Sequence, residues 1–281
     1  MLLLLAVLAG AAFQDTDTTV AVRAGARLNL DNFDGGVTIT TWNKSSMRVQ
    51  ATHDDDTRIE IDARGGSVDV RGRSRYGPPD VEYRITVPAD MSLEIGTQSG
   101  DVDIDGSRGE IQVQTVEGRI TVSGGSGRVS LSSVEGEVQL TGASGRISIS
   151  AVDGSVSVKG ARGDLQISAV DGAILLEDID AASVEASTVD GAIDFRGMIK
   201  EGGRYRLSSH DGDVTVTAPS INASVSVSTY EGEFESDFPV TITGTRSRKR
   251  LDFTLGSGSA RLELESFDGS VRLRKESGRR P

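Results

Sequence analysis

The chain has 281 residues with a formal net charge of −12, contains 34 glycines and no cysteine, and is only 4% aromatic. The acidic balance argues against a nucleic-acid-binding body, because such proteins neutralise phosphates with Lys and Arg, and without cysteine we expect neither a disulfide framework nor a lipid-modified cysteine. Glycines that do not recur every third residue exclude collagen, and short Val, Ile and Leu alternations argue against disorder.

The first nine residues are an unbroken apolar run, and small residues follow at Gly10, Ala11 and Ala12. We interpret residues 1–13 as a secretory signal peptide, too short to span a bilayer as a helix. A buried N-terminal strand is the alternative, which the lack of alternation disfavours. The mature protein is therefore predicted to be exported to the periplasm, the cell envelope or the extracellular space, and not to be an integral membrane protein.

Residues 14–97 contain irregular strand-like runs, interrupted at Gly77-Pro78-Pro79 and at Pro88. They are predicted to form N-terminal β coils and a cap, because the open end of a stack of strands is a template for aggregation. His53-Asp54-Asp55-Asp56 could form a metal corner. An exposed polar loop is favoured instead, because no second His lies nearby.

Residues 98–236 are predicted to form regular solenoid repeats, because glycines fall nine residues apart from Gly100 to Gly172. Alternate glycines differ in kind, so the unit is eighteen residues. One kind follows an apolar residue and an acid, as in Val116-Glu117-Gly118, Val134-Glu135-Gly136, Val152-Asp153-Gly154 and Val170-Asp171-Gly172. Similar acid–glycine motifs follow with looser spacing at Val189-Asp190-Gly191, His210-Asp211-Gly212, Tyr230-Glu231-Gly232 and Phe267-Asp268-Gly269. Self-similarity at a fixed period indicates a solenoid.

Between the glycines, apolar and polar residues alternate with period two, which predicts short strands with an inward apolar face. Asp-Gly also favours hairpins, so an antiparallel meander is the alternative. A parallel coil explains better why like residues recur every eighteen positions. The predicted fold is an all-β parallel β-solenoid (β-helix) of about 18–21 residues per two-strand coil, with irregular β caps at both ends. Its interior aliphatics should form ladders, with members such as Val113, Leu131, Ile149, Ile167, Val184 and Val225.

Residues 237–281 are predicted to form C-terminal coils, a cap and a basic tail. From Gly244 onward there are ten Lys or Arg against five Asp or Glu. The excess lies in Thr245–Arg250, in Arg272-Leu273-Arg274-Lys275 and in Arg279-Arg280. Solvated loops or tails are the favoured interpretation, and contact with an anionic surface is the alternative.

The acids before the turn glycines should stack along one edge of a parallel coil, about 4.8 Å apart. Ca²⁺ bridging these carboxylates is one hypothesis, but solvent-facing turn residues are favoured. The Ca²⁺ candidates are Glu117, Glu135, Asp153, Asp171, Asp190, Asp211 and Glu231. No catalytic residue, no other metal ligand and no other cofactor-binding residue is predicted.

Four stretches carry a family resemblance: Leu28–Val37, the Ile85–Ile95 step, Ser99-Gly100-Asp101-Val102, and the closing Gly256–Val271. Through them the chain resembles the bacterial "putative-adhesin" family of β-strand-repeat proteins, a domain of unknown function. The resemblance implies a β-solenoid in a cell-envelope or exported setting, and it brings no catalytic residues.

These observations favour a non-enzymatic exported β-solenoid, acting as an adhesin-like or scaffold protein of the bacterial cell envelope. Its expected partner is an unknown envelope protein or glycan, and not nucleic acid. One alternative is a β-helix carbohydrate-active enzyme, although such enzymes use larger coils with long loops around a cleft. Another is an envelope-stress regulatory binding module, indicated only by the basic C-terminal segment.

Overall fold

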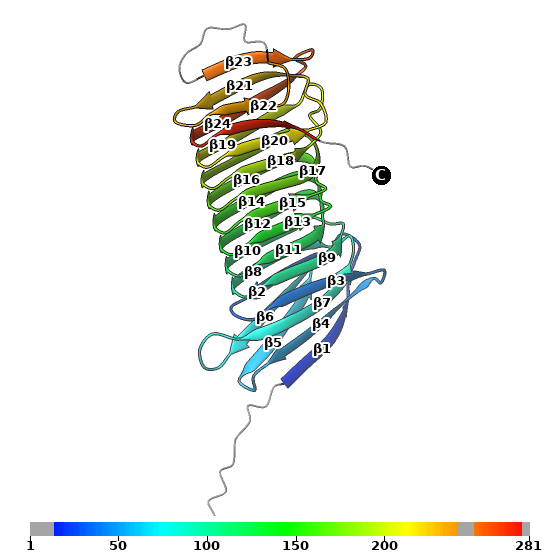
Figure 1. The fold of residues 1–281 in the computed structure, drawn as a ribbon. Helices are drawn as coiled ribbons and strands as arrows, with labels where there is room; N and C mark the ends of the chain where they lie inside the picture. Colours follow the sequence, from blue (N-terminus) through cyan, green and yellow to red (C-terminus); the bar gives the residue numbers. More distant parts are fainter. Residues whose placement is uncertain (1–13, 241–249, 277–281) are drawn as a thin grey trace, which may run out of the picture.

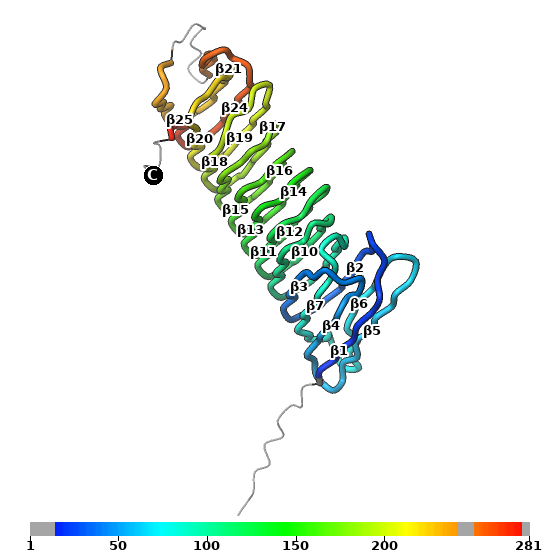
Figure 2. The backbone as a smooth tube through the Cα atoms, turned by 90° about the vertical axis from the view of Figure 1, so that its right-hand side faces the viewer, coloured from blue at the N-terminus to red at the C-terminus, as the bar shows by residue number. Residues whose placement is uncertain are grey.

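A computed structural model describes residues 14–240 and 250–276 of the chain, so the predicted signal peptide, most of Thr245–Arg250 and Arg279-Arg280 lie outside the described residues. The described part contains 25 strands and no helix, and the all-β prediction is confirmed. The strands form two sheets that run side by side along an elongated stack (Figure 1). The tube view shows the successive coils along the length of the molecule (Figure 2).

The first sheet, sheet A, is described here by its strands in spatial order. They are β1 (Gln14–Ala21), β4 (Ser46–His53), β7 (Val81–Pro88), β3 (Val37–Trp42), β9 (Val102–Ser107), β11 (Ile120–Gly124), β13 (Val138–Thr141), β15 (Val156–Lys159), the first part of β17 (Ile174–Asp190), β18 (Ile193–Gly197), β20 (Val214–Ala218), β25 (Val271–Lys275) and β22 (Phe234–Ser236).

The second sheet, sheet B, is ordered in the same way. Its strands are β5 (Thr57–Arg64), β6 (Ser67–Ser74), β2 (Arg27–Asn32), β8 (Ser92–Ser99), β10 (Ile111–Glu117), β12 (Ser126–Glu135), β14 (Ser144–Asp153), β16 (Arg162–Asp171), the second part of β17, β19 (Arg204–Asp211), β24 (Ala260–Asp268), β21 (Ala223–Thr229) and β23 (Arg250–Leu255).

In the middle of the stack each strand pairs in parallel with its equivalent one repeat later. Ile111 is in register with Val129, and Val129 with Ile147, a shift of eighteen residues at each step. Each repeat therefore contributes one strand to sheet B and one to sheet A, and the inward side chains form the core between the sheets. Burying one such aliphatic side chain stabilises the fold by about 1.5–3 kcal/mol.

The six expected interior residues fall into two neighbouring ladders. Val113, Leu131, Ile149 and Ile167 align as predicted. All six expected residues are buried, but Val184 pairs with Leu165 instead of Ile167. Opposite Gly163 and Asp164, β17 carries one extra residue between Ala181 and Ser183, and this shift brings Val184 into register with Leu165. Val225, in register with Leu262, belongs to the same neighbouring ladder through Tyr205.

The acid–glycine turns pack so closely that the stack requires glycine. Gly118 has a φ of +128°, and a Cβ there would lie 2.3 Å from the carbonyl oxygen of Gly100 in the preceding coil. Only a residue without a Cβ combines that φ with such a close backbone approach. The turn glycines therefore set the spacing at this edge of the stack.

At the N-terminal end, the first coil of the chain is not the first coil of the stack. β2 and β3 pair with β8 and β9 on one side and with β6 and β7 on the other. The outer strands β1, β4 and β5 complete this end through antiparallel pairing.

At the C-terminal end, β24 and β25 lie inside the stack. β24 pairs with β19 and β21, and β25 pairs with β20 and β22. Among the described residues from Asp237 onward, β24 and β25 are therefore inserted coils, and the antiparallel β23 is the outermost strand of sheet B. A coil from later in the chain can be inserted in this way because parallel coils of equal width offer the same backbone hydrogen bonds at their edges.

Candidate functional site

Along the edge of the stack that carries the acid–glycine turns, a row of apolar and aromatic side chains faces solvent. We call this row the turn ridge, and its members each precede a turn acid. They are Val116, Val134, Val152, Val170, Val189, His210, Phe267 and Tyr230. The large hydrophobic members are between 41% (Val134) and 49% (Tyr230) exposed. Adjoining exposed apolar side chains are a feature by which candidate interaction surfaces are recognised.

The turn ridge arises from a break in strand alternation. Thr115 points inward and is buried, but the next two residues, Val116 and Glu117, are both exposed. The pairs Thr115–Ser133 and Glu117–Glu135 flank the valines in register, so consecutive coils place one valine above the next. Inside the turn, the Thr115 hydroxyl donates a hydrogen bond to the carbonyl oxygen of Glu117 at 3.0 Å, which fixes the corner.

The C-terminal part of the turn ridge is a stack of three aromatic rings. The rings of His210 and Phe267 lie 4.8 Å apart at 18°, and those of Phe267 and Tyr230 lie 4.7 Å apart at 9°. Phe267 reaches this central place because β24 is inserted between β19 and β21. The sequence interpretation placed His210 in the slot filled elsewhere by Val, Tyr or Phe, but it did not identify the stack.

Beside the turn ridge runs a row of carboxylates, which we call the acid row. Its members are Glu117, Glu135, Asp153, Asp171, Asp190, Asp211, Asp268 and Glu231. The seven Ca²⁺ candidates all belong to it and are exposed. Asp211 is in register with Asp268, which was not among the candidates and separates Asp211 from Glu231.

The acid row is not neutralised from within the described part of the chain. Neither a hydrogen bond nor an ion pair links its carboxylates to described side chains. Arg119 and Arg162 pair with acids outside the row, at 3.6 Å from Glu137 and 3.7 Å from Asp180. Within residues 14–240 and 250–276, three or more His, Cys, Asp or Glu groups never come together in a way that could hold a metal ion. The calcium hypothesis therefore gains no geometric support.

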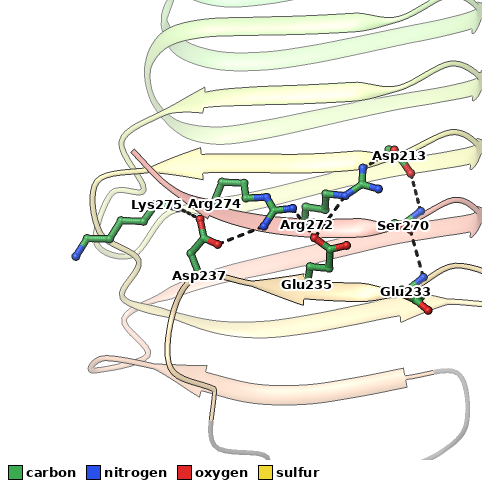
Figure 3. A network of polar contacts seen from close by, with 8 residues as sticks. All are labelled: Asp213, Glu233, Glu235, Asp237, Ser270, Arg272, Arg274 and Lys275. Atoms are coloured by element: carbon green, nitrogen blue, oxygen red, sulfur yellow. Dashed lines mark hydrogen bonds and ion pairs between the residues drawn. The ribbon is translucent and has the colours of Figure 1, made fainter. Parts of the chain in front are cut away.

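The basic run Arg272-Leu273-Arg274-Lys275 is a strand of the stack, not a solvated tail. Arg272 donates a hydrogen bond to Asp213, while Arg274 contacts Glu235 and, at 3.2 Å, Asp237 (Figure 3). The hydrogen bond from Arg272 holds the pKa of Asp213 below its ordinary value of 3.8. These two arginines are neutralised by β22 and by the turn before β20, which weakens the interpretation as a site for an anionic surface.

The expected exposed polar loop is present at Asp54, Asp55 and Asp56, which are exposed, but the expectation is wrong for His53. It ends β4 and is only 4% exposed. One ring nitrogen, Nε2, lies 2.9 Å from the Thr16 hydroxyl, and Nδ1 lies 2.8 Å from the Asp54 carbonyl oxygen. With both ring nitrogens used, His53 ties β1 to β4, because a buried ring needs partners for its polar atoms.

A second candidate surface is a shallow hollow of about 710 Å³ on the outward face of sheet B. It exists because Gly96 carries no side chain between its polar neighbours. Asp69 accepts a hydrogen bond from Asn29 at 2.7 Å, and Glu94 pairs with Arg27 at 3.3 Å. The lining includes Asn29, Asp31, Asp69, Glu94, Gln112 and Gln114. Two of its three carboxylates are therefore engaged by neighbours.

A family model described as Toastrack DUF4097 matches residues 13–274. Among solved structures, a "putative adhesin" from Parabacteroides distasonis is 11% identical with a TM-score of 0.52, over 92% of this chain and 97% of that one. A "putative adhesin" from Bacteroides fragilis is 13% identical with a TM-score of 0.48, at 92% and 97% coverage. A "putative lipid binding protein" from Parabacteroides distasonis is 11% identical with a TM-score of 0.44, at 92% and 96% coverage. No curated protein matches. At 11% identity, the likeness to the Parabacteroides distasonis "putative adhesin" shows the fold alone.

Proposed function

We propose that this chain, which belongs to the Toastrack DUF4097 family, is a non-enzymatic, exported binding scaffold of the bacterial cell envelope. The family match confirms the resemblance noted in the sequence. We further infer that the two-sheet stack is a parallel β-solenoid with irregular β caps at both ends, because its central strands repeat in parallel register.

The observation that carries this proposal is the turn ridge. Exposed valines such as Val134, at 41%, and Val170, at 47%, recur on consecutive coils at positions where the fold gains little from an apolar residue. A rigid stack holds such a row at fixed spacing, so a partner that matches the spacing makes many small contacts at once. Contiguous apolar surface of this kind is typical of interaction sites.

The comparison with the Parabacteroides distasonis "putative adhesin" supports an adhesin-like role and a cell-envelope or extracellular setting. The apolar N-terminal run supports export. Within the described residues, the chain has no helix that is long and apolar enough to cross a membrane.

A carbohydrate-active enzyme is the main alternative, and the hollow around Gly96 is the surface that it would use. Glycoside hydrolysis needs two carboxyl groups at a set separation, one of them free to donate a proton. In the hollow, hydrogen bonds from Asn29 and Arg27 already engage Asp69 and Glu94. This arrangement favours binding over catalysis.

The proposal is tested by incubating residues 14–281 with glycan and peptide arrays and, separately, with soluble polysaccharides. We expect saturable binding to one class of ligand and polysaccharide chains of unchanged length. Shortened polysaccharide would overturn the non-enzymatic proposal. Export is tested by expressing the full chain in a bacterium and sequencing the N-terminus of the recovered protein. An uncleaved protein confined to the cytosol would contradict it.

A further inference from the structure

The turn ridge and the acid row lie next to each other along the whole repeat region, because each ridge residue directly precedes an acid of the row. We propose that this double row binds a basic amphipathic α-helix of a partner protein. The apolar stripe of that helix packs on the ridge valines, and its Lys or Arg side chains reach the acid row. The inference rests on the proposed binding function and specifies the chemistry of the partner.

The spacing of the turn ridge suits an α-helix. Successive coils advance by about 4.8 Å, whereas one turn of an α-helix advances by about 5.4 Å. A helix laid along the stack therefore presents about one apolar side chain per coil through its i, i+3 and i+4 positions. The five valines from Val116 to Val189 span about 19 Å, which corresponds to about 13 helical residues. An extended strand fits less well, because side chains on one face recur only every 6.6 Å or so.

The charge of the acid row favours a cationic partner. Eight exposed carboxylates follow one another, one per coil, and none has a cationic partner among the described residues. Like charges about 4.8 Å apart repel, so a cationic partner is favoured over a neutral one. An anionic membrane, a nucleic acid or a second copy docked ridge to ridge would add negative charge to the same edge. The acid row therefore disfavours all three.

The two ends of the turn ridge differ in the side chains that they carry. Its C-terminal end carries the stacked rings of His210, Phe267 and Tyr230, and the rest carries only valines. The central ring, Phe267, remains 45% exposed although both of its faces are covered. Large aromatic side chains dominate binding energy at interfaces. We infer that this end anchors the helix and sets its direction.

The test uses two designed peptides of about 18 residues, a length that covers the valine part of the ridge and part of the aromatic stack. Both carry the same leucine stripe, flanked by Lys in one peptide and by Glu in the other. Each is titrated into residues 14–281 by calorimetry. We expect the Lys peptide to bind at least tenfold more tightly than the Glu peptide. That ratio should shrink at about 0.5 M salt, because salt screens exposed charges.

Three variants identify the residues that the Lys peptide contacts. A ridge variant carries Val134→Ser, Val152→Ser and Val170→Ser, and an acid-row variant carries Glu135→Gln, Asp153→Asn and Asp171→Asn. A charge-matched control carries Glu185→Gln, Asp194→Asn and Glu265→Gln, on the outward faces of the sheets. The ridge and acid-row variants should each lose at least tenfold in affinity for the Lys peptide, and the control should change less than twofold. Unchanged circular dichroism melting curves establish that each variant is folded.

Equal binding of the two peptides, or an equal loss in the charge-matched control, would overturn the proposal. Binding to anionic lipid vesicles that is lost in the ridge variant would also overturn the proposal and would make a membrane the occupant of the ridge. Self-association in sedimentation that is lost in the ridge variant would overturn it in favour of a second copy of this chain. A saturable array ligand whose affinity is the same for the ridge variant would overturn the helix proposal and leave the binding-scaffold function standing. If neither array shows a ligand and neither peptide binds, both proposals fail.

Discussion

The carbonyl oxygen of Gly136 lies 2.3 Å from the point where a side chain at position 154 would place its Cβ. Gly154 also has a φ of +146°, a conformation that essentially only glycine adopts. The same contact joins successive turn glycines along the stack. These glycines therefore hold the turn ridge at its spacing, and their replacement should be costly.

The first prediction concerns this contact. Gly154→Ala should lower the free energy of unfolding by about 3 kcal/mol or more, because backbone strain and a clash with Gly136 add together. Gly142→Ala is the control, since Gly142 has a φ of +70° but its Cβ would meet no atom within 4 Å. That variant should lose only about 1 kcal/mol. Urea unfolding monitored by circular dichroism compares the two, and equal losses would show that the close approach does not matter.

The second prediction concerns the interior ladder. Ile149 is 2% exposed and stacks between Leu131 and Ile167. Ile149→Ala should cost about 2–5 kcal/mol through lost burial and the cavity left behind. Ser150→Ala, on the outward face of the same strand, should change stability by less than about 0.5 kcal/mol. Thermal melting tests the pair, and a small effect at Ile149 would contradict the inward register.

The third prediction concerns the dependence of stability on pH. Because Arg272 lowers the pKa of Asp213 in the folded protein, their interaction stabilises the fold fully above the ordinary value of 3.8 and is lost as pH falls through the lower folded value. Asp213 is 42% exposed, so solvent limits the contribution to about 1 kcal/mol. Asp213→Asn should destabilise the protein by about that amount near pH 7, and the difference from the unsubstituted chain should vanish as pH falls below the lowered pKa of Asp213.

Urea midpoints measured across this pH range check that prediction. Asp103→Asn is the control, because Asp103 lies on the outward face of sheet A. It forms neither an ion pair nor a side-chain hydrogen bond with the described residues. Its effect should be near zero at neutral pH. A deficit of Asp213→Asn that stays constant or grows as pH falls would contradict the role of the ion pair with Arg272.

The fourth prediction concerns the aromatic end of the turn ridge. Phe267→Ala removes two stacked contacts, with His210 and with Tyr230, and should cost about 1–2 kcal/mol. Val170→Ala removes an equally exposed ridge residue without ring stacking and should cost less than about 0.5 kcal/mol. Amide hydrogen exchange should show faster opening of β24 in the Phe267 variant alone. Unchanged exchange in β24 would show that the stack does not hold the inserted strand.

Much of the fold could be predicted from the period. The eighteen-residue spacing and the period-two alternation identified Leu131 and Ile149 as equivalent inward residues, because in a parallel stack equivalent positions meet. Val184 was expected as an interior residue but could not be placed in a particular ladder, because one extra residue on β17, between Ala181 and Ser183, shifts the pairing there and puts Val184 opposite Leu165. The longer step from Gly172 to Gly191 shows in the sequence that this repeat holds an extra residue, but it does not show where the strand accommodates it.

The order of the coils could not be predicted. The Phe267-Asp268-Gly269 motif indicated that this segment forms one of the acid–glycine turns. It did not indicate that Asp268 would stand between Asp211 and Glu231, because every coil edge offers the same backbone hydrogen bonds. The ion pairs of Arg272 and Arg274 favour this order of the coils, because their carboxylate partners lie on the two neighbouring coils.

The sequence predicted the acid row of the candidate site but not the turn ridge. The acids before glycine marked the acid row, and their exposure agrees with solvent-facing turn residues. The valines before those acids stood in the same motif, but alternation alone does not indicate which way a residue points at a turn. The local break after Thr115 turns Val116 outward, and that break becomes visible only in the paired strands.

The most direct test of the account is a comparison of three proteins against the ligand found on the glycan or peptide arrays. They are the unsubstituted chain, the ridge variant with serine at positions 134, 152 and 170, and a face variant with alanine at positions 132, 150 and 168. If the turn ridge is the binding surface, the ridge variant should lose at least tenfold in affinity, about 1.4 kcal/mol, and the face variant should bind like the unsubstituted chain. A face variant that loses binding while the ridge variant keeps it would contradict the account.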